Sequence, residues 1–418
     1  MLYQLLKGYT RIELDVYLID FFYDNLPLFF TFASVTILAQ VLSSNKYIGY
    51  FVAVLILLVW EIVLSVMDIS SNMLNVGGGA SVEYSDMNGF GPGVKAAMWF
   101  NLYWVLFSVL ALLIAGALWS RGSKSSLLTR LKTARKEIPK SYRGVIAIAA
   151  IAWISVASFV YYNTQVLNPY FSSDTSEKLS ADYEKKYSKY KAIVSPKVTD
   201  TKYYIDIFPE ERNIHVKAEI ELTNESGKVI DSLHFYTNKD WDTNLVIPNA
   251  KSVYKDSTYL LTIYKLSPAL QPGEKLTMIV NNKYITKGFK NNRGSTMVVK
   301  NGTFFNNSDI LPIIGYNANY ELSDKNTRNK YDLPEKDRMP ELTSGVTDLH
   351  MDSAMFEGLS DFINVETVIS TTANQTAIAP GSLIKKWEEN DRSYFHYKLD
   401  TPSLNFYSFM SAEYEIEK

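Results

Sequence analysis

Long apolar segments occupy the first part of the chain, and a two-residue alternation of apolar and polar positions occupies the second part. Four of the apolar segments are close to the ~20 residues that an α-helix needs to cross a bilayer. Helices packed in a soluble core usually keep a polar face, so all-round hydrophobicity of this length predicts transmembrane helices. The predicted spans are residues 26–42, 48–67, 96–119 and 145–162.

The loop between the third and fourth spans determines the expected orientation. It is short and strongly basic, with Glu137 as its single acidic residue, and such loops stay in the cytoplasm. The fourth span should then run outward, and everything after Tyr162 should lie outside, together with residues 1–25 and 68–95. The basic residues are Arg121, Lys124, Arg130, Lys132, Arg135, Lys136, Lys140 and Arg143.

Polar and aromatic residues within the spans are candidates for special roles. Glu61 is an acid inside the second span, and intramembrane carboxylates are often functional. It lies toward the expected outer end, so the alternative is a side chain that reaches the interface. The aromatic residues near the ends of the third span predict interfacial anchors, as Trp and Tyr favour the headgroup region: Trp99, Tyr103, Trp104 and Trp119.

The second part of the chain predicts a mainly-β domain. We expect a membrane domain at 1–165, a linker or stalk helix at 166–196 and an extracytoplasmic β domain at 197–418. Leu179, Tyr183, Tyr187 and Tyr190 recur at helical spacing, which favours packing of the stalk helix against the β domain. The polar stretch 319–340 predicts a surface loop.

Alternation with a period of two begins near Lys202. Ile214, Val216, Ala218, Ile220 and Leu222 alternate with polar residues, which is typical of a half-buried antiparallel strand. Short strands separated by Gly, Pro and Asn turns predict a sandwich or saddle-shaped sheet. Further strands are predicted at residues 229–236, 259–266, 275–280, 296–299, 365–370, 392–399 and 406–416.

Composition excludes several kinds of chemistry. The chain has no cysteine, which rules out disulfides and thiolate metal sites, and its net charge of −2 gives no footprint for nucleic acid. H-E-x-x-H, the P-loop and the G-x-S-x-G nucleophile motif are absent. The four histidines lack ligand spacing, and the sequence predicts no catalytic or metal site in this chain. They are His215, His234, His350 and His396.

Several segments resemble a known family. The run YYIDIFPEERNIHVKAEIELTN, from Tyr203 to Asn224, and NGTFFNNSDILPIIGYNANYELSD, from Asn301 to Asp324, resemble the N-terminal β domain of aminopeptidase N-type zinc metallopeptidases. The membrane motifs YSDMNGFGPG (84–93) and FNLYW (100–104) resemble a bacterial subgroup in which such a peptidase is fused to an ABC-transporter permease.

The resemblance implies a fragment: the last permease helices followed by the non-catalytic peptidase domain. In the family, G-A-M-E-N and H-E-x-x-H belong to a following catalytic domain, so zinc is expected only there. A segment of the β domain reaches the family's substrate cleft, where a Gln or Glu holds the free amine. Asn306 and Asn307 lie in the comparable stretch, and the alternative for them is a plain loop position.

Three functions are compatible with the sequence. The first is a membrane-anchored part of a zinc aminopeptidase that frames a peptide substrate for a catalytic domain. The second is a permease subunit that works with further helices and an ABC ATPase and receives cargo on its β domain. The third is a β binding or scaffold module displayed on a membrane. All three place the chain in the bilayer of a bacterial inner membrane.

Overall fold

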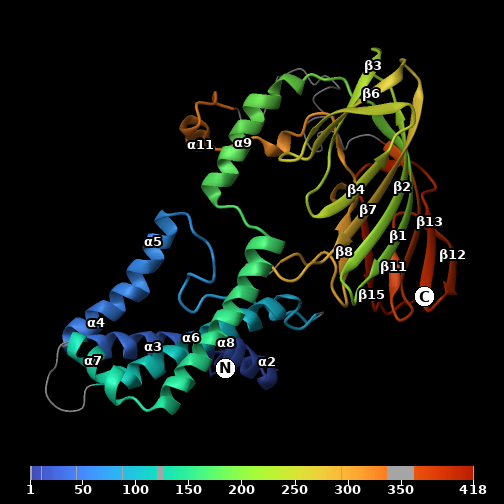
Figure 1. Ribbon diagram of the computed structural model, residues 1–418. Coiled ribbons are helices and arrows are strands. Elements are labelled where there is room, and N and C mark those ends of the chain that lie inside the picture. The colour runs from blue at the N-terminus through green and yellow to red at the C-terminus, as the bar shows by residue number, and fades with distance from the viewer. Residues whose placement is uncertain are drawn as a thin grey trace. The chain divides into compact units, whose positions relative to one another are not determined.

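The computed structural model describes residues 2–10, 12–43, 45–86, 88–119, 127–292, 294–336 and 362–417. Over these residues the chain forms two compact units, one mainly helical and one mainly β (Figure 1). The helical unit holds Met1–Ser173 and also the short segment Lys287–Gly294. The β unit holds Asp174–Thr286 and Ser295–Lys418. This division differs from the sequence-based one, because the stalk helix groups with the strands and residues 287–294 group with the helices.

Within the described residues, the helical unit contains four helices long and apolar enough to cross a membrane: Leu14–Leu42, Lys46–Val66, Gly93–Leu118 and Lys140–Leu167. Each overlaps one predicted span, which confirms four long apolar helices; their placement in a bilayer stays a prediction. The elements are α1 (Leu2–Leu6), α2 (Leu14–Asp20), the π-helical η1 (Phe21–Asn25), α3 (Leu26–Leu42), α4 (Lys46–Val54), η2 (Leu55–Val59), α5 (Trp60–Val66), α6 (Gly93–Leu118), α7 (Leu127–Glu137), α8 (Lys140–Tyr161) and η3 (Tyr162–Leu167).

The first long helix begins earlier than the sequence predicts. The first predicted span starts at residue 26, yet α2 and η1 continue the helix back to Leu14. Asp15 lies in the first turn of α2, where the partial positive charge of a helix N-terminus favours an acid. The acidic residues make residues 14–25 less apolar than the predicted span, but they do not end the helix.

Small or polar side chains lie where the long helices contact each other. The hydroxyl of Ser108 on α6 is hydrogen-bonded to that of Thr31 on α3, at 3.2 Å. Gly116 of α6 faces the hydroxyl of Tyr142 on α8, so closely that a Cβ there would lie 2.9 Å from it. Gly49 of α4 is similarly tight against α3. Small residues are typical of helix contacts in membranes, because they allow the backbones to approach closely.

The β unit begins with helix α9 (Ser173–Tyr187) and the 3-10 turn η4 (Ser188–Tyr190). Its strands are β1 (Lys197–Phe208), β2 (Asn213–Thr223), β3 (Ile230–Tyr236), β4 (Trp241–Val246), β5 (Ala250–Asp256), β6 (Leu261–Leu270), β7 (Lys275–Ile285), β8 (Thr303–Asn306), β9 (Ile313–Ile314), β10 (Phe362–Thr372), β11 (Thr376–Ile378), β12 (Ser382–Glu389), β13 (Arg392–Lys398), β14 (Ser403–Leu404) and β15 (Ser408–Ala412). Short helical elements are α10 (Asn307–Ile310), η5 (Ala318–Tyr320) and α11 (Lys325–Lys330).

The strands of the described residues form three sheets. The large sheet has the order β12-β13-β10-β1-β2-β7-β4, with β14 beside β10. The smaller sheets have the orders β11-β15-β8 and β5-β6-β3-β9. β1 pairs with β2 in antiparallel and with β10 in parallel, which places an early and a late strand of the β unit side by side. The mainly-β class predicted for this part is confirmed.

One face of the large sheet forms the core. On β2 the predicted inward set is confirmed, because every second residue from Ile214 to Leu222 is buried and the residues between them are not. The buried residues pack with apolar side chains of both smaller sheets, including Phe305 of β8, Phe409 of β15 and Phe235 of β3. Burial on this scale is the main force that stabilises the domain. The inward residues of β2 are Ile214, Val216, Ala218, Ile220 and Leu222.

Two kinds of strand prediction were wrong. Residues 296–299 form no strand. Val298 and Val299 belong to a loop, and their side chains are buried in the core. Their apolar character therefore indicates burial and not pairing with a neighbouring strand. In contrast, β5 and β12 are not predicted by the sequence, because nearly all of their residues are exposed. Both are edge strands, and edge strands need no alternation since neither face is fully covered.

The tyrosine stripe of α9 packs inside the β unit. Tyr183 and Tyr187 are 0% and 2% exposed. The ring of Tyr183 lies 5.4 Å from Tyr259 and 5.8 Å from Tyr236, both in or next to strands of the β5-β6-β3-β9 sheet. Its hydroxyl accepts a hydrogen bond from the backbone N–H of Asn317. The helical spacing of these tyrosines therefore reports packing, as the sequence predicts.

The stretch 319–340 is not simply a surface loop. Its described part contains α11, and Arg328 of this helix is only 2% exposed. The guanidinium donates to both carboxylate oxygens of Glu184 on α9, at 2.8 and 2.9 Å, and to the carbonyls of Leu322 and Pro334. A polar composition misleads here because the charge is buried together with its partner. Residues 337–340 lie outside the described residues.

Two carboxylates that accept hydrogen bonds from residues in or near α9, those of Asp256 and Glu321, make the stability of the β unit sensitive to acid. Burial alone raises the pKa of Asp256, but hydrogen bonds from Lys186 and Tyr187 outweigh it and lower that pKa to about 2. The same balance, with Lys191, Lys336 and Tyr316 as donors, lowers the pKa of Glu321 to about 2. Folded-state pKa values below the unfolded ones stabilise the fold above the unfolded pKa, and the contribution is lost as the pH falls.

We therefore expect the urea midpoint of the β unit to be steady from pH 7 to about 5 and to fall between about pH 4.5 and 2. Near-ultraviolet circular dichroism of the full chain in mild detergent measures it. Asp256→Asn should lower the midpoint at pH 7 and flatten the acid decline. Lys265 pairs with the exposed Asp231, so Asp231→Asn is the matched control and should change little. An equally steep decline in the Asp256 variant would contradict the assignment.

The segment Lys287–Gly294 follows β7 and precedes β8, yet it packs with the helices. Phe289 is 6% exposed, and its ring centroid lies 6.3 Å from that of Phe100 on α6 and 6.0 Å from that of Phe159 on α8. Asn168, after η3, donates its side-chain N–H groups to the backbone carbonyls of Lys287 and Phe289 at 2.9 and 3.2 Å. The segment is therefore held by both apolar contacts and hydrogen bonds.

The same segment also contacts the loop at 68–95. The side-chain oxygen of Asn291 accepts from the backbone N–H of Asn72 at 3.0 Å, and its Nδ2 donates to the carbonyl of Ser70 at 2.8 Å. The loop itself lies close on α3, where a Cβ at Gly77, whose φ is +73°, would approach Leu28 to 2.6 Å. The 68–95 loop, the end of α8 and the segment 287–294 thus meet at one end of the helices.

Phe289→Ala should release this segment to proteases. Removing a buried ring from an apolar site costs about 3–5 kcal/mol of local stability, and Lys287 and Lys290 are tryptic sites within the segment. Limited trypsin digestion of the full chain in detergent should show much faster cleavage there. Asn292→Ala changes an exposed neighbour and serves as the control. Equal cleavage of both variants would mean that Phe289 does not hold the segment.

Candidate functional site

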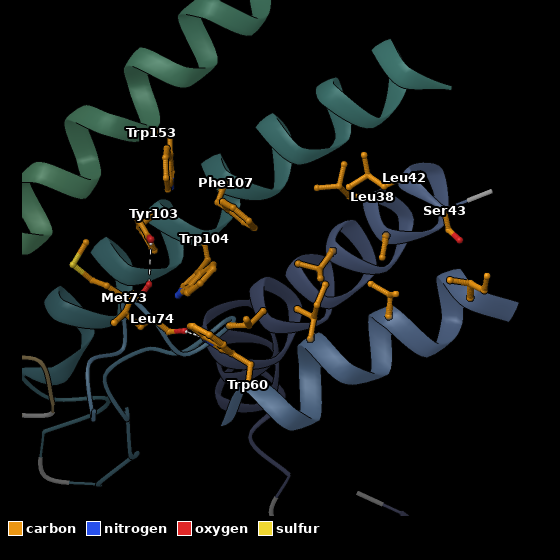
Figure 2. Close-up of a pocket in the computed structure, with 16 residues that line it drawn as sticks. Leu38, Leu42, Ser43, Trp60, Met73, Leu74, Tyr103, Trp104, Phe107 and Trp153 are labelled. Atoms are coloured by element: carbon orange, nitrogen blue, oxygen red, sulfur yellow. Dashed lines mark hydrogen bonds between the residues drawn. The ribbon is translucent and has the colours of Figure 1, made fainter. Parts of the chain in front are cut away.

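A cavity of about 670 Å³ lies in the helical unit between α3, the α4–α5 helix and α6 (Figure 2). Its walls are largely aliphatic and aromatic: Leu38 comes from α3, Ile56 from η2, Phe107 from α6 and Trp153 from α8. Cavities of this size and apolar character are typical of sites for small organic ligands. We call this cavity the helical groove.

Aromatic side chains line one end of the helical groove, and the 68–95 loop holds them in place through hydrogen bonds (Figure 2). Trp60, Tyr103 and Trp104 each donate a hydrogen bond to a backbone carbonyl of that loop, at 2.8, 3.1 and 3.2 Å. Since their polar atoms are satisfied by the loop, the rings present only apolar surface to the groove. The acceptors are the carbonyls of Leu74, Met73 and Asn72, in that order.

This arrangement corrects part of the anchor prediction. Tyr103 and Trp104 are 7% and 5% exposed and bind the loop, so they do not stand as free interfacial anchors. The sequence signal that could have identified the groove is the presence of Trp60, Trp104 and Trp153 on three different spans. Such a set can converge only through tertiary packing. Trp119 is exposed at the end of α6, where the anchor role stays a prediction.

The other end of the helical groove lies at Ser43, just after α3. Arg130 of α7 donates from Nη1 to the carbonyl of Val41 and from Nη2 to that of Ser43, the latter at 3.5 Å. It thereby satisfies carbonyls that the helix terminus leaves unpaired. Arg130 is 9% exposed, and its Nε has no hydrogen-bond partner among the described residues.

Glu61, the predicted intramembrane acid, follows Trp60 on α5 and is exposed on the surface of the helical unit. It is not among the residues that line the groove. A functional role for Glu61 stays a prediction.

Asn306 and Asn307, the predicted substrate-facing pair, lie at the junction of β8 and α10. Asn306 is the N-cap of α10, in a capping box with Asp309, and its side-chain oxygen accepts from Ser408 at 2.7 Å. Asn307 is 2% exposed; its side-chain nitrogen donates to Asn405, and its side-chain oxygen accepts from the backbone N–H of Tyr407. Both amides therefore organise the β8–β15 region, and contact with a substrate stays a prediction.

The histidines are dispersed, and no group of three or more His, Asp or Glu in the described part of the chain could hold a metal ion. His396 pairs with Glu366 at 2.9 Å on the large sheet, and the ring of His215 packs at a tilt against that of Phe208. His234 is 4% exposed and packs against Tyr190. Burial lowers the pKa of His234, which keeps it neutral near pH 7. His350 lies outside the described residues.

Comparisons with known proteins give one kind of match. No family model and no curated protein matches the chain. Among solved structures, it is similar to a two-domain M1 zinc metallopeptidase variant bound to L-tryptophan, with 10% identity and a TM-score of 0.33 over 52% of this chain and 43% of that one. It is also similar to the M1 zinc metallopeptidase from Deinococcus radiodurans, with 10% identity and a TM-score of 0.31 over 52% and 42%. The chain thus spans less than half the length of the M1 zinc metallopeptidases that it matches.

Proposed function

We propose that this chain is a membrane-anchored, non-catalytic part of a zinc aminopeptidase system. Its helical unit holds it in a bilayer, and its β unit frames a peptide substrate for a catalytic domain whose motifs do not occur in these 418 residues. The observation that carries the proposal is the presence, in the described residues of one chain, of four long apolar helices and a mainly-β unit. A short segment between two strands of the β unit, Lys287–Gly294, also belongs to the helical unit.

The packing of Phe289 and Asn291 within the helical unit supports a second attachment of the chain there. The chain passes between the two units three times, near Ser173 and at both ends of Lys287–Gly294. An attachment at more than one point is what the proposed anchoring role needs.

The alternative is a permease subunit, in which the β unit receives cargo. Apolar side chains of α8 are exposed, including Val145, Ile148, Ile151 and Ile154, and they would face lipid or further membrane helices. The deciding observation is co-purification: a P-loop ATPase retained with the chain in mild detergent supports the permease reading.

The first experiment measures zinc content and hydrolysis of an aminoacyl-arylamide by the purified chain in detergent. We expect no stoichiometric zinc and no turnover, because hydrolysis by this class of enzyme needs a metal-bound water and a general base. Stoichiometric zinc together with turnover would overturn the non-catalytic assignment. A cross-linked partner from native membranes that carries H-E-x-x-H would support the platform role, and cross-linking only to unrelated proteins would count against it.

A further inference from the structure

The geometry points to the helical groove as a binding site for one acyl chain of an anionic phospholipid, with its headgroup at the Ser43 end. This inference rests on the proposed membrane placement of the helical unit. It concerns the contents of the groove and not the role of the β unit.

The dimensions of the groove fit a lipid chain within one leaflet. The lining residues of the second long helix run from Ile48 to Trp60, a rise of about 18 Å at ~1.5 Å per residue. One leaflet of the hydrocarbon core is about 15 Å thick, half of ~30 Å. The groove therefore extends over about the depth of one leaflet, from Ile48 to Trp60.

The lining argues against a helix as the occupant. Where helices of this unit contact each other, residues such as Gly49, Ser108 and Gly116 allow close approach. Of the sixteen residues that line the groove, only Ala39 and Ser43 are small. Bulky aliphatic and aromatic walls hold a helix backbone away, whereas a flexible acyl chain can fill the space between them and bury apolar surface.

Charge distinguishes the two ends of the groove. Lys46 is exposed and lies between two lining positions, Ser43 and Ile48. Arg130 contacts the carbonyl of Ser43, and α7 carries further exposed basic residues in its last turn. At the opposite end, Glu61 follows Trp60. A phosphate headgroup is attracted by the cationic end and repelled by the acidic one, so an anionic lipid is oriented with its headgroup beside Lys46.

Native mass spectrometry of the full chain, purified in mild detergent and supplied with equal amounts of phosphatidylglycerol and phosphatidylcholine, tests the inference. We expect one retained phospholipid per chain, with phosphatidylglycerol preferred. Val52→Trp fills the groove and should abolish retention. Ile62→Trp places the same ring on the exposed face of α5 and should leave it intact.

Variants that remove a single surface charge test the lipid preference even if Val52→Trp fails to fold. Lys46→Gln removes one surface charge, which should weaken the preference for phosphatidylglycerol about fivefold. Lys140→Gln, at the exposed start of α8, should not change it. Retention of detergent only, equal retention of both lipids, or a stoichiometric polypeptide lost on Val52→Trp would each overturn the inference. A failure here with correct membrane topology would leave the proposed function standing.

Discussion

Replacing Arg328 with alanine is expected to destabilise the β unit by about 3–5 kcal/mol, because the buried carboxylate of Glu184 loses both hydrogen bonds from the guanidinium and keeps, among the described residues, only the ammonium of Lys191, at 3.9 Å. Glu184 is 6% exposed and Arg328 is 2% exposed. The loss is a large share of the ~5–15 kcal/mol that stabilises a typical domain. Urea denaturation of the full chain in mild detergent measures it, with the near-ultraviolet signal of the buried tyrosines reporting on the β unit.

Lys325, also on α11, provides the matched control. It pairs with Glu335 at 2.7 Å, but both side chains are about two-thirds exposed, and exposed ion pairs contribute only about 0–1 kcal/mol. Lys325→Ala should therefore shift the urea midpoint little. The double variant Glu184→Leu with Arg328→Met should be less destabilised than Arg328→Ala, since it leaves no unpaired charge. Similar losses in Arg328→Ala and Lys325→Ala would mean that α11 does not depend on the buried pair.

Single cysteines should be labelled in an all-or-none manner on the two sides of the membrane. The chain contains no cysteine, so each introduced thiol is the sole target of a membrane-impermeant maleimide. In intact bacterial spheroplasts, Lys239→Cys in the β unit should react fully. Lys132→Cys in the basic helix α7 should react only after permeabilisation, because short basic loops remain in the cytoplasm.

Both positions are exposed, so a difference in labelling reports the side of the membrane and not burial. The unsubstituted chain controls for labelling of other groups and should show none. Labelling of Lys132→Cys in intact spheroplasts would reverse the orientation. Equal labelling of both variants before permeabilisation would mean that the long apolar helices do not separate the basic loop from the β unit.

The contacts of Asp256 and Phe289 illustrate what local sequence patterns can and cannot predict. The spacing of Tyr183 and Tyr187 predicts a helix with a buried face, because the 3.6-residue period is visible in the sequence whatever the helix packs against. Neither the partner strand nor the carboxylate beside it can be deduced from that spacing. The burial of Phe289 is even harder to predict from the sequence, because a single aromatic residue in the polar segment 287–294 forms no periodic pattern.

The sequence by itself determined the four long apolar helices and the inward set of β2, because length and periodicity depend only on neighbouring residues. Tertiary structure alone decided the parallel pairing of β1 with β10, the burial of Arg328 and the helical groove. Each of these joins residues far apart in the chain: Asp200 pairs with Asn364, and Arg328 binds Glu184. Such contacts depend on the free energy of the whole packed unit, which no local pattern encodes.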